Sequence, residues 1–209
     1  MVLKGQFLER STLVPVEGVV MEGTAHRGER QPPLLILPPR PEEGGGMDHV
    51  LCAELAFAAA RAGHATLRFN YRGVGASQGT RGGALLEEAS AALDVALENA
   101  QGSAAAVAAL HGSAPVALAL QARRPQACGL CLVAPRELSL EALKPLSVPL
   151  LVILWAGDTH TPRAPLSAAL AEVGGTLEVI EDAGPAFPRH LAAVGHLVAR
   201  WLSTLPGRR

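Results

Sequence analysis

The chain has 209 residues, of which 49% are hydrophobic and 18% are charged, so we expect a folded globular protein with one sizeable core. Its 18 Lys and Arg nearly balance its 19 Asp and Glu, and a formal net charge of −1 argues against nucleic acid as a partner. No apolar run is long enough to span a membrane, and residues 1–6 form no apolar signal segment. We therefore expect a single domain over residues 1–209, located in the cytoplasm, with no membrane partner.

Strands and helices alternate along the chain after an antiparallel start. Short apolar runs between turn residues predict strands at 8–27 (one or two antiparallel strands), 34–37, 65–70, 105–110, 130–133, 149–154 and 176–180. Apolar residues at helical spacing predict helices at 48–62, 84–100, 114–123, from 162 onward, and 191–201. Asp48 and Thr161 are the expected N-caps of two of these helices. The alternation predicts an α/β fold with a mostly parallel sheet, helices on both faces and an antiparallel N-terminal edge.

The loops that follow the strands are the expected place for a ligand, because open parallel sheets bind ligands at the carboxyl ends of their strands. Five loops therefore matter: 38–48, 70–83, 110–114, 155–162 and 181–190. The connection after the strand at 130–133 is short, so we expect no large lid.

Cys128 and Cys131 have the spacing of a C-x-x-C motif, but no second cysteine pair accompanies them. Cys131 falls in a predicted buried strand, where cysteine packs as a small apolar residue. We therefore expect no redox motif and no metal at this position, and we expect no cofactor in the protein.

Residues 109–114, Ala-Leu-His-Gly-Ser-Ala, join a predicted strand directly to a predicted helix. A turn this tight needs small side chains two residues before and two residues after its tip, because those backbones nearly touch. Ala109 and Ser113 supply the small flanks when His111 is the tip, whereas a turn centred on Ser113 would place His111 and Pro115 on its flanks. Sterics therefore favour a sharp strand–turn–helix with His111 at its tip.

Residues 67–79, Leu-Arg-Phe-Asn-Tyr-Arg-Gly-Val-Gly-Ala-Ser-Gln-Gly, carry a family resemblance. They are similar, almost residue for residue, to the L-R-F-N-F-R-G-V-G-x-S-x-G pattern of small cytoplasmic α/β hydrolases related to dienelactone hydrolases and short esterases. Residues 38–47 resemble the H-P-H-P…G-G-x-M segment of that family, with Pro38 and Arg40 in place of its two histidines. The resemblance extends from about residue 34 to the C-terminus, and it implies a three-layer α/β-hydrolase fold without a large lid.

A dinucleotide-binding loop is the competing interpretation of Gly73-x-Gly75 after a strand. The next glycine falls at 79 rather than 78, and the block does not belong to a first βαβ unit near the N-terminus. We favour a turn that needs positive φ angles, with Arg72 bonding to local carbonyl or carboxylate groups.

The resemblance assigns a nucleophile, an acid and a histidine base in that chain order, and two of the three positions are altered. Asp158 falls on the acid position, although a loop carboxylate that accepts backbone N–H bonds is an equally good interpretation of it. His111 falls on the nucleophile position and Pro185 on the base position, where proline cannot transfer a proton. His190, five residues farther on, could serve as the base only if its loop folded back.

Some oxyanion stabilisation could survive these changes. The backbone N–H of Gly112 follows the tip residue and could act as one oxyanion donor. Pro41 has no N–H, so Arg40 or a neighbour would have to supply the second.

We therefore predict a hydrolase-like protein with a degenerate triad, a pseudoenzyme that is non-catalytic or a very weak hydrolase. It would bind a small-molecule ligand or a protein partner in a crevice lined by His111, Asp158 and Arg40. The alternative is an active hydrolase of small acyl esters or thioesters that uses Ser113 or His111 with Asp158 and a displaced histidine such as His190. His111, Asp158 and His160 are a permissible but undiagnostic metal-ligand set. Homodimer formation is left open.

Overall fold

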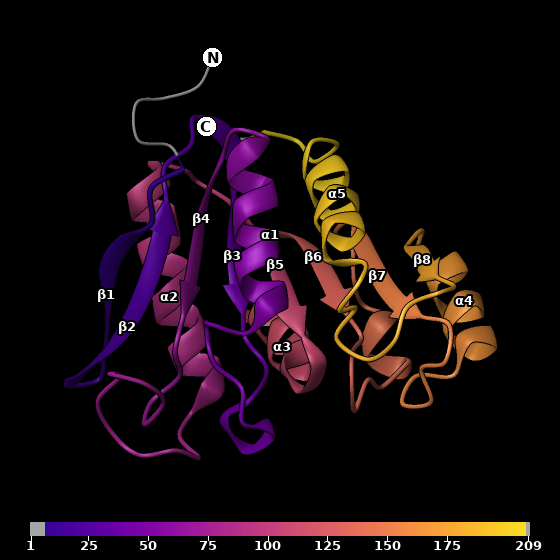
Figure 1. The fold of residues 1–209 in the computed structure, drawn as a ribbon, viewed down its shortest axis with the longest axis horizontal. Helices are drawn as coiled ribbons and strands as arrows, with labels where there is room; N and C mark the ends of the chain where they lie inside the picture. The colour runs from indigo at the N-terminus through magenta and orange to yellow at the C-terminus, as the bar shows by residue number, and fades with distance from the viewer. Residues whose placement is uncertain (1–6, 208–209) are drawn as a thin grey trace.

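The computed structural model describes residues 7–207 of the chain. Residues 1–6, for which no signal segment is expected, lie outside the described residues, as do Arg208 and Arg209. Figure 1 shows one continuous sheet with helices packed on both of its faces. The sheet has eight strands in the order β1-β2-β4-β3-β5-β6-β7-β8.

The strands are β1 (Arg10–Val16), β2 (Val19–His26), β3 (Arg30–Leu37), β4 (His64–Phe69), β5 (Ala105–Leu110), β6 (Ala127–Val133), β7 (Leu150–Trp155) and β8 (Thr176–Ile180). The helices are α1 (Val50–Arg61), α2 (Leu85–Ala100), α3 (Ala114–Arg123), α4 (Arg163–Glu172) and α5 (Leu191–Leu202). Short 3₁₀ turns cover Pro41–Glu43, His111–Ser113 and Glu141–Leu143. The β1–β2 and β2–β4 pairs are antiparallel, and all pairs from β4–β3 to β7–β8 are parallel, which confirms the predicted fold class.

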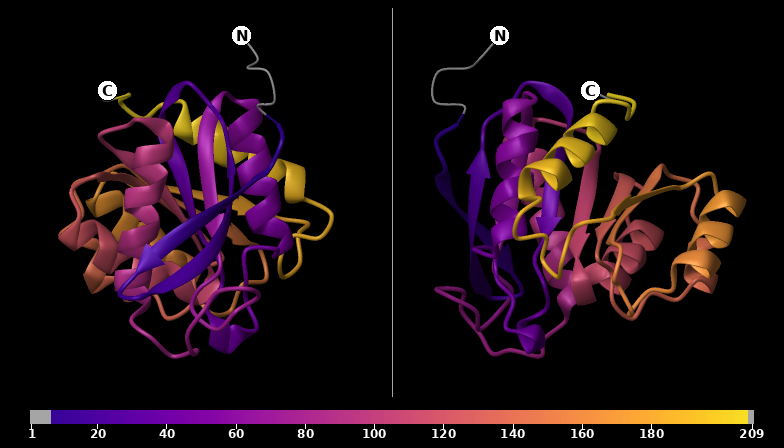
Figure 2. Two further views of the ribbon diagram at one scale, coloured as in Figure 1. Left: turned by 90° about the vertical axis from the view of Figure 1, so that its left-hand side faces the viewer. Right: turned by 45° about the vertical axis from the view of Figure 1, so that its right-hand side comes forward.

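Two apolar cores lie on opposite faces of the sheet, because alternate side chains of a strand point to opposite sides. Leu35 and Leu37 of β3 belong to the core covered by α2, α3 and α4, whereas Leu34 and Ile36 belong to the core covered by α1 and α5. Figure 2 shows the sheet from its β1–β2 edge, with these two groups of helices on either side. Strands buried on both faces explain why β3 and β5 are continuous apolar runs rather than alternating ones.

Two expected helix caps are wrong by one residue. The N-cap of α1 is His49, whose Nδ1 accepts a hydrogen bond from the Leu51 amide at 3.3 Å. Asp48 is drawn away from that position because its carboxylate pairs with the Arg68 guanidinium at 3.0 Å. α4 begins after Pro162 rather than at it, and the Thr161 hydroxyl donates to the carbonyl oxygen of Pro135 at 2.7 Å instead of capping the helix.

The glycine-rich block after β4 is a turn, as the favoured interpretation predicts. Gly73 and Gly75 have φ angles of 68° and 56°, the left-handed region where a side chain is strained. Arg72 reaches the carboxylates of Glu17 at 3.3 Å and Glu88 at 3.5 Å. These contacts fasten the block to the β1–β2 turn and to α2.

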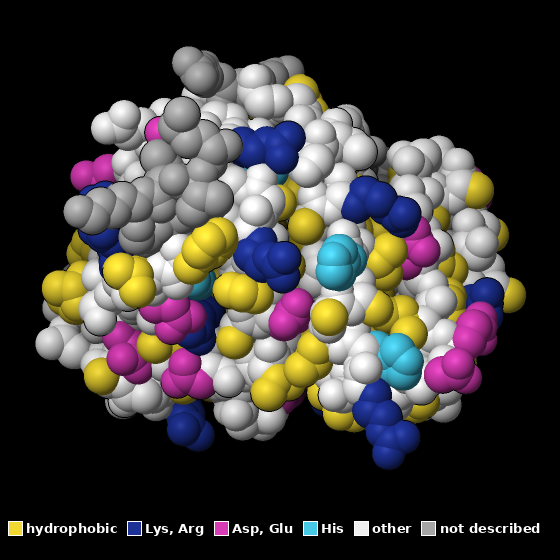
Figure 3. Space-filling view, turned by 45° about the horizontal axis from the view of Figure 1, so that its top comes forward, with side chains coloured by type: hydrophobic (Ala, Val, Ile, Leu, Met, Phe, Trp, Pro, Cys, Tyr) yellow, Lys and Arg dark blue, Asp and Glu magenta, His cyan; other side chains and the backbone are white. Residues whose placement is uncertain are grey.

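The surface seen in Figure 3 carries basic and acidic side chains intermixed, with no broad patch of one sign. Among residues 7–207, no helix is both long enough and apolar enough to cross a bilayer.

Candidate functional site

A cavity of about 280 Å³ opens at the carboxyl ends of the parallel strands, where the fold predicts a ligand. Its walls come from the loops after β3, β5, β6, β7 and β8. Four of the five expected loops contribute, and the loop at 70–83 does not. A more open hollow of about 650 Å³ lies between residues 27–31 and 99–101, and the described residues in its walls carry no imidazole, hydroxyl or thiol side chain. The smaller cavity is therefore the candidate site.

The turn after β5 has the shape that the small flanking residues predict. β5 ends at Leu110, His111–Ser113 form one 3₁₀ turn, and α3 begins at Ala114. His111 sits at the tip with φ of +50°, a conformation that costs a residue with a Cβ roughly 1–3 kcal/mol. Its side chain is buried except for the part that lines the cavity.

Ser113 lies on the other side of this turn. Its Oγ donates to the carbonyl oxygen of Pro38 at 2.6 Å and lies 3.4 Å from the Tyr71 hydroxyl. The residue is fully buried and does not line the cavity. The hydroxyl is therefore directed into the protein, away from the space that a substrate would enter.

The Glu43 carboxylate occupies the position where the expected donors would hold an oxyanion. Its Oε2 accepts hydrogen bonds from the backbone amides of Arg40 at 3.2 Å and Gly112 at 3.1 Å. Its Oε1 accepts from Nη1 of Arg136 at 3.2 Å. The two amides expected to stabilise an oxyanion thus converge on one oxygen, and that oxygen belongs to the chain itself. We call this arrangement of the two amides and Arg136 the Glu43 cradle.

Glu43 also separates the expected donors from the cavity. Arg40 and Gly112 do not line it, in contrast to the expectation for Arg40, and the Arg40 guanidinium pairs with Glu137 at 2.7 Å. A Cβ added to Gly112 would lie 2.5 Å from Nε of Arg40 and 2.9 Å from Oε2 of Glu43. The two donors were expected from the sequence, but the carboxylate that they bind was not. The sequence signal for a carboxylate here is that Glu42 and Glu43 precede three glycines. That pattern does not tell which of the two carboxylates points toward the amides.

Two histidines face each other across the cavity wall. The rings of His49 and His111 have centroids 5.5 Å apart and meet edge to face. Burial lowers the pKa of both imidazoles; proximity to His111 lowers the pKa of His49 further, and Arg136 lowers that of His111 further. These effects favour the neutral form of both rings at pH 7. His49 was not among the candidates from the sequence, because its role depends on a contact between residues 62 positions apart in the chain.

Asp158 lines the cavity as a loop carboxylate. Its Oδ1 accepts from the amides of His160 at 2.8 Å and Thr161 at 3.3 Å. Within residues 7–207 no hydrogen bond joins Asp158 to a histidine ring, and Nδ1 of His111 lies 3.3 Å from the carbonyl oxygen of Ala134 instead. The acid therefore does not orient an imidazole here.

The base position also lacks a proton carrier. Pro185 lines the cavity where the family resemblance places a histidine. His190 is the N-cap of α5, does not line the cavity, and holds its Nδ1 buried without a hydrogen-bond partner. Among the described residues, no group of three or more His, Cys, Asp or Glu is placed to hold a metal ion. His111, Asp158 and His160 thus share the cavity without forming a metal site.

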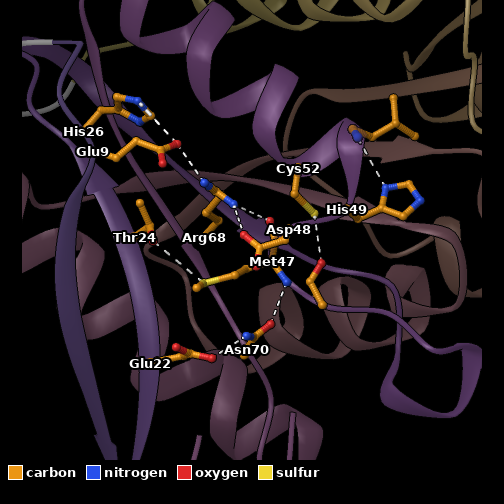
Figure 4. A network of polar contacts seen from close by, with 12 residues as sticks. Glu9, Glu22, Thr24, His26, Met47, Asp48, His49, Cys52, Arg68 and Asn70 are labelled. Atoms are coloured by element: carbon orange, nitrogen blue, oxygen red, sulfur yellow. Dashed lines mark hydrogen bonds and ion pairs between the residues drawn. The ribbon is translucent and has the colours of Figure 1, made fainter. Parts of the chain in front are cut away.

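Side chains of the Arg-Phe-Asn segment hold the loop that leads into α1 (Figure 4). Oδ1 of Asn70 accepts from the Met47 amide at 2.6 Å, and Nη1 of Arg68 donates to the Met47 carbonyl oxygen at 2.6 Å. Nη2 of Arg68 also reaches Glu9 at 2.7 Å. Because both polar groups of the Met47 backbone are held, the loop enters α1 with His49 in a fixed position.

Comparison with known proteins gives the fold a name. No family model matches the chain, and a search of curated proteins gives no match. Among solved structures, a protein of unknown function from Agrobacterium tumefaciens is similar, with a TM-score of 0.81, 24% identity, and 94% of this chain and 99% of that one covered.

Two further structures are similar over nearly the whole chain. An α/β serine hydrolase without a lid from Xanthomonas campestris has a TM-score of 0.78 at 20% identity, covering 96% of this chain and 97% of that one. Dienelactone hydrolase from Anabaena variabilis has a TM-score of 0.74 at 20% identity, covering 98% and 100%. The chain has the α/β-hydrolase fold, of the form without a lid.

Proposed function

We propose that this protein binds a small molecule in the cavity at the carboxyl ends of its strands and does not carry out serine-dependent ester hydrolysis. The observation that carries the proposal is the Glu43 carboxylate, which takes the two backbone amides that a hydrolase keeps open for its oxyanion. A tetrahedral oxyanion placed there would meet a negative charge and no vacant donor. Loss of a single oxyanion donor costs a serine hydrolase about 10²–10³ in kcat, and here both are taken.

The nucleophile and the base support the same conclusion. Ser113 donates its proton to the Pro38 carbonyl oxygen and lies outside the cavity, and Pro185 cannot accept a proton. Loss of the serine or of the histidine alone costs a serine–histidine enzyme on the order of 10⁶ in turnover. The residual rate that binding and an oxyanion hole can supply, about 10³–10⁴ over water, depends on an oxyanion hole that Glu43 fills.

A small molecule is favoured over a protein partner because the cavity is enclosed by five loops. At about 280 Å³ it lies just below the usual size range of ligand pockets, about 300–1,000 Å³, so its ligand has few heavy atoms. Trp155 and Pro185 give it apolar wall, and imidazole and carboxylate groups supply the polar contacts.

A second candidate is slow hydrolysis with His111 as the nucleophile, favoured by one observation. His111 occupies the tip of the turn at φ +50°, the place where this fold exposes its nucleophile, and the imidazole lines the cavity. An acyl group transferred to the ring would still need a base to activate water, and Asp158 is engaged by backbone amides.

A labelling experiment separates the two candidates. The folded protein is treated with a fluorophosphonate and separately with p-nitrophenyl acetate, and any adduct is located by mass spectrometry. The proposal expects no adduct on Ser113 or His111 and no hydrolysis above that of the His111→Asn variant. An adduct on either residue, with turnover that the variant loses, would establish the hydrolase instead.

A further inference from the structure

We propose that the cavity takes an uncharged ligand with an amide-type group, a carbonyl beside an N–H as in a carboxamide or lactam. That group would bridge Nε2 of His49 and Nε2 of His111. The inference rests on the proposed function, since it names the chemical class of the small molecule that the cavity binds.

The hydrogen bonds of the two rings fix which nitrogen carries the proton. The Leu51 amide donates to Nδ1 of His49, so this nitrogen has no hydrogen and the neutral ring carries its proton on Nε2. A carbonyl oxygen can only accept, so Nδ1 of His111 donates to Ala134 and its Nε2 keeps a lone pair. The pair thus presents one N–H donor and one nitrogen acceptor.

Both Nε2 atoms are available for a ligand. Among residues 7–207, neither His49 nor His111 makes a hydrogen bond through Nε2, and neither atom is a buried polar atom without a partner. Both residues line the cavity. The ring centroids are 5.5 Å apart, so one small group can lie against both imidazoles and form hydrogen bonds of about 2.9 Å with them.

The charges of the site argue against an anionic ligand. The Glu43 cradle is the only place near the cavity where backbone amides and a guanidinium converge among the described residues, and it is filled. Arg136 is paired with Glu43, and Arg40 is paired with Glu137. Asp158 adds a second carboxylate to the wall. A carboxylate ligand would therefore enter beside two negative charges, and the part of the chain that the structure describes offers it no unpaired cation in the cavity lining.

A cation fits the histidine pair no better. An ammonium group has donors only, so it could bond to Nε2 of His111 but would leave the N–H of His49 without an acceptor. An amide satisfies both atoms at once, and an unpaired buried donor costs about 1–3 kcal/mol. Trp155 lines the same cavity, and an aromatic residue there favours a planar ligand of the size of benzamide.

Three probes of similar shape test the ligand class: benzamide, benzoate and benzylamine. Binding is followed by protein-observed NMR, which also reports that the protein is folded. We expect benzamide to bind at least tenfold more tightly than either charged probe, with shift changes at His49 and His111. Equal or tighter binding of benzoate or benzylamine, or no binding of benzamide, would overturn the inference.

Two variants remove the bridging atoms while keeping the backbone. His49→Asn retains an N-cap acceptor for the Leu51 amide but lacks the distal N–H. His111→Asn keeps a residue that tolerates positive φ but lacks the distal acceptor. Each should weaken benzamide binding at least tenfold, whereas His196→Asn on α5, outside the cavity lining, should leave it unchanged. Unchanged binding in either cavity variant would contradict the bridge.

The tautomers have their own readout. Long-range proton–nitrogen NMR spectra of the imidazoles should show His49 protonated at Nε2 and His111 at Nδ1, and the opposite tautomer in either ring would remove the basis of the inference. Failure of the proposed function can be distinguished from failure of this inference. A covalent adduct with turnover would refute the proposed function, whereas binding of a charged probe in the cavity would refute only the ligand class.

Discussion

Replacement of Glu43 by alanine tests the central feature of the site. The change removes an acceptor that serves the amides of Arg40 and Gly112, and Gly112 is buried. Buried hydrogen bonds to a charged group contribute about 1.5–3 kcal/mol each. Part of this loss is offset, because water from the cavity can bind the freed amides and because the variant no longer has to desolvate the Glu43 carboxylate when it folds. The Arg136 side chain is 40% exposed, so its ion pair contributes less than about 1 kcal/mol. We expect a destabilisation of about 2 kcal/mol.

Urea denaturation of Glu43→Ala measures this value, and thermal unfolding should show a Tm lower by about 4–8 °C for a chain of this length. Glu42→Ala is the matched control, because Glu42 lies on the same 3₁₀ turn and is exposed. It should change the free energy of unfolding by less than about 0.5 kcal/mol. The vacated cradle should also bind benzoate more tightly than the wild type does. A Glu43→Ala variant as stable as Glu42→Ala, with no gain in benzoate binding, would refute the cradle.

Three further predictions follow from the same geometry. His111→Ser should remain inactive toward p-nitrophenyl acetate, because Pro185 leaves it without a base and Glu43 fills the cradle; a fast esterase from this single change would contradict both arguments. Asn70→Ala should destabilise the protein by about 1–3 kcal/mol and speed hydrogen exchange at the Met47 amide, which loses its acceptor; unchanged exchange would argue against a pinned loop. Burial lowers the pKa of His26, His49, His64 and His111, so the unfolded chain binds protons that the folded chain does not. The free energy of unfolding should therefore fall as the pH drops from 7 to about 5. The slope should be shallower in His64→Asn, which has one buried imidazole fewer. A free energy that does not change over this pH range would be inconsistent with neutral buried imidazoles.

The order of the strands and helices, and the shape of the turn at His111, could be predicted from local sequence patterns. Continuous apolar runs such as Leu34–Leu37 are compatible only with burial on both faces, and the helices between them require parallel pairing. The small residues on either side of His111 place it at the tip of the turn through steric effects that act over only a few residues. Such features are readable because their causes lie within one or two turns of chain.

The contacts between polar groups could not be predicted in this way, because they depend on how the strands are arranged in the sheet. Glu43 reaches the Gly112 amide 69 residues away, and Ser113 reaches the Pro38 carbonyl oxygen 75 residues away, because β3 and β5 are neighbours in the sheet. Arg68 takes the Asp48 carboxylate and thereby leaves His49 as the cap of α1. Each of these contacts joins residues from different parts of the chain, so it depends on strand order rather than on local propensity. The fold was therefore predictable from hydrophobic patterning, whereas the carboxylate in the oxyanion position was not.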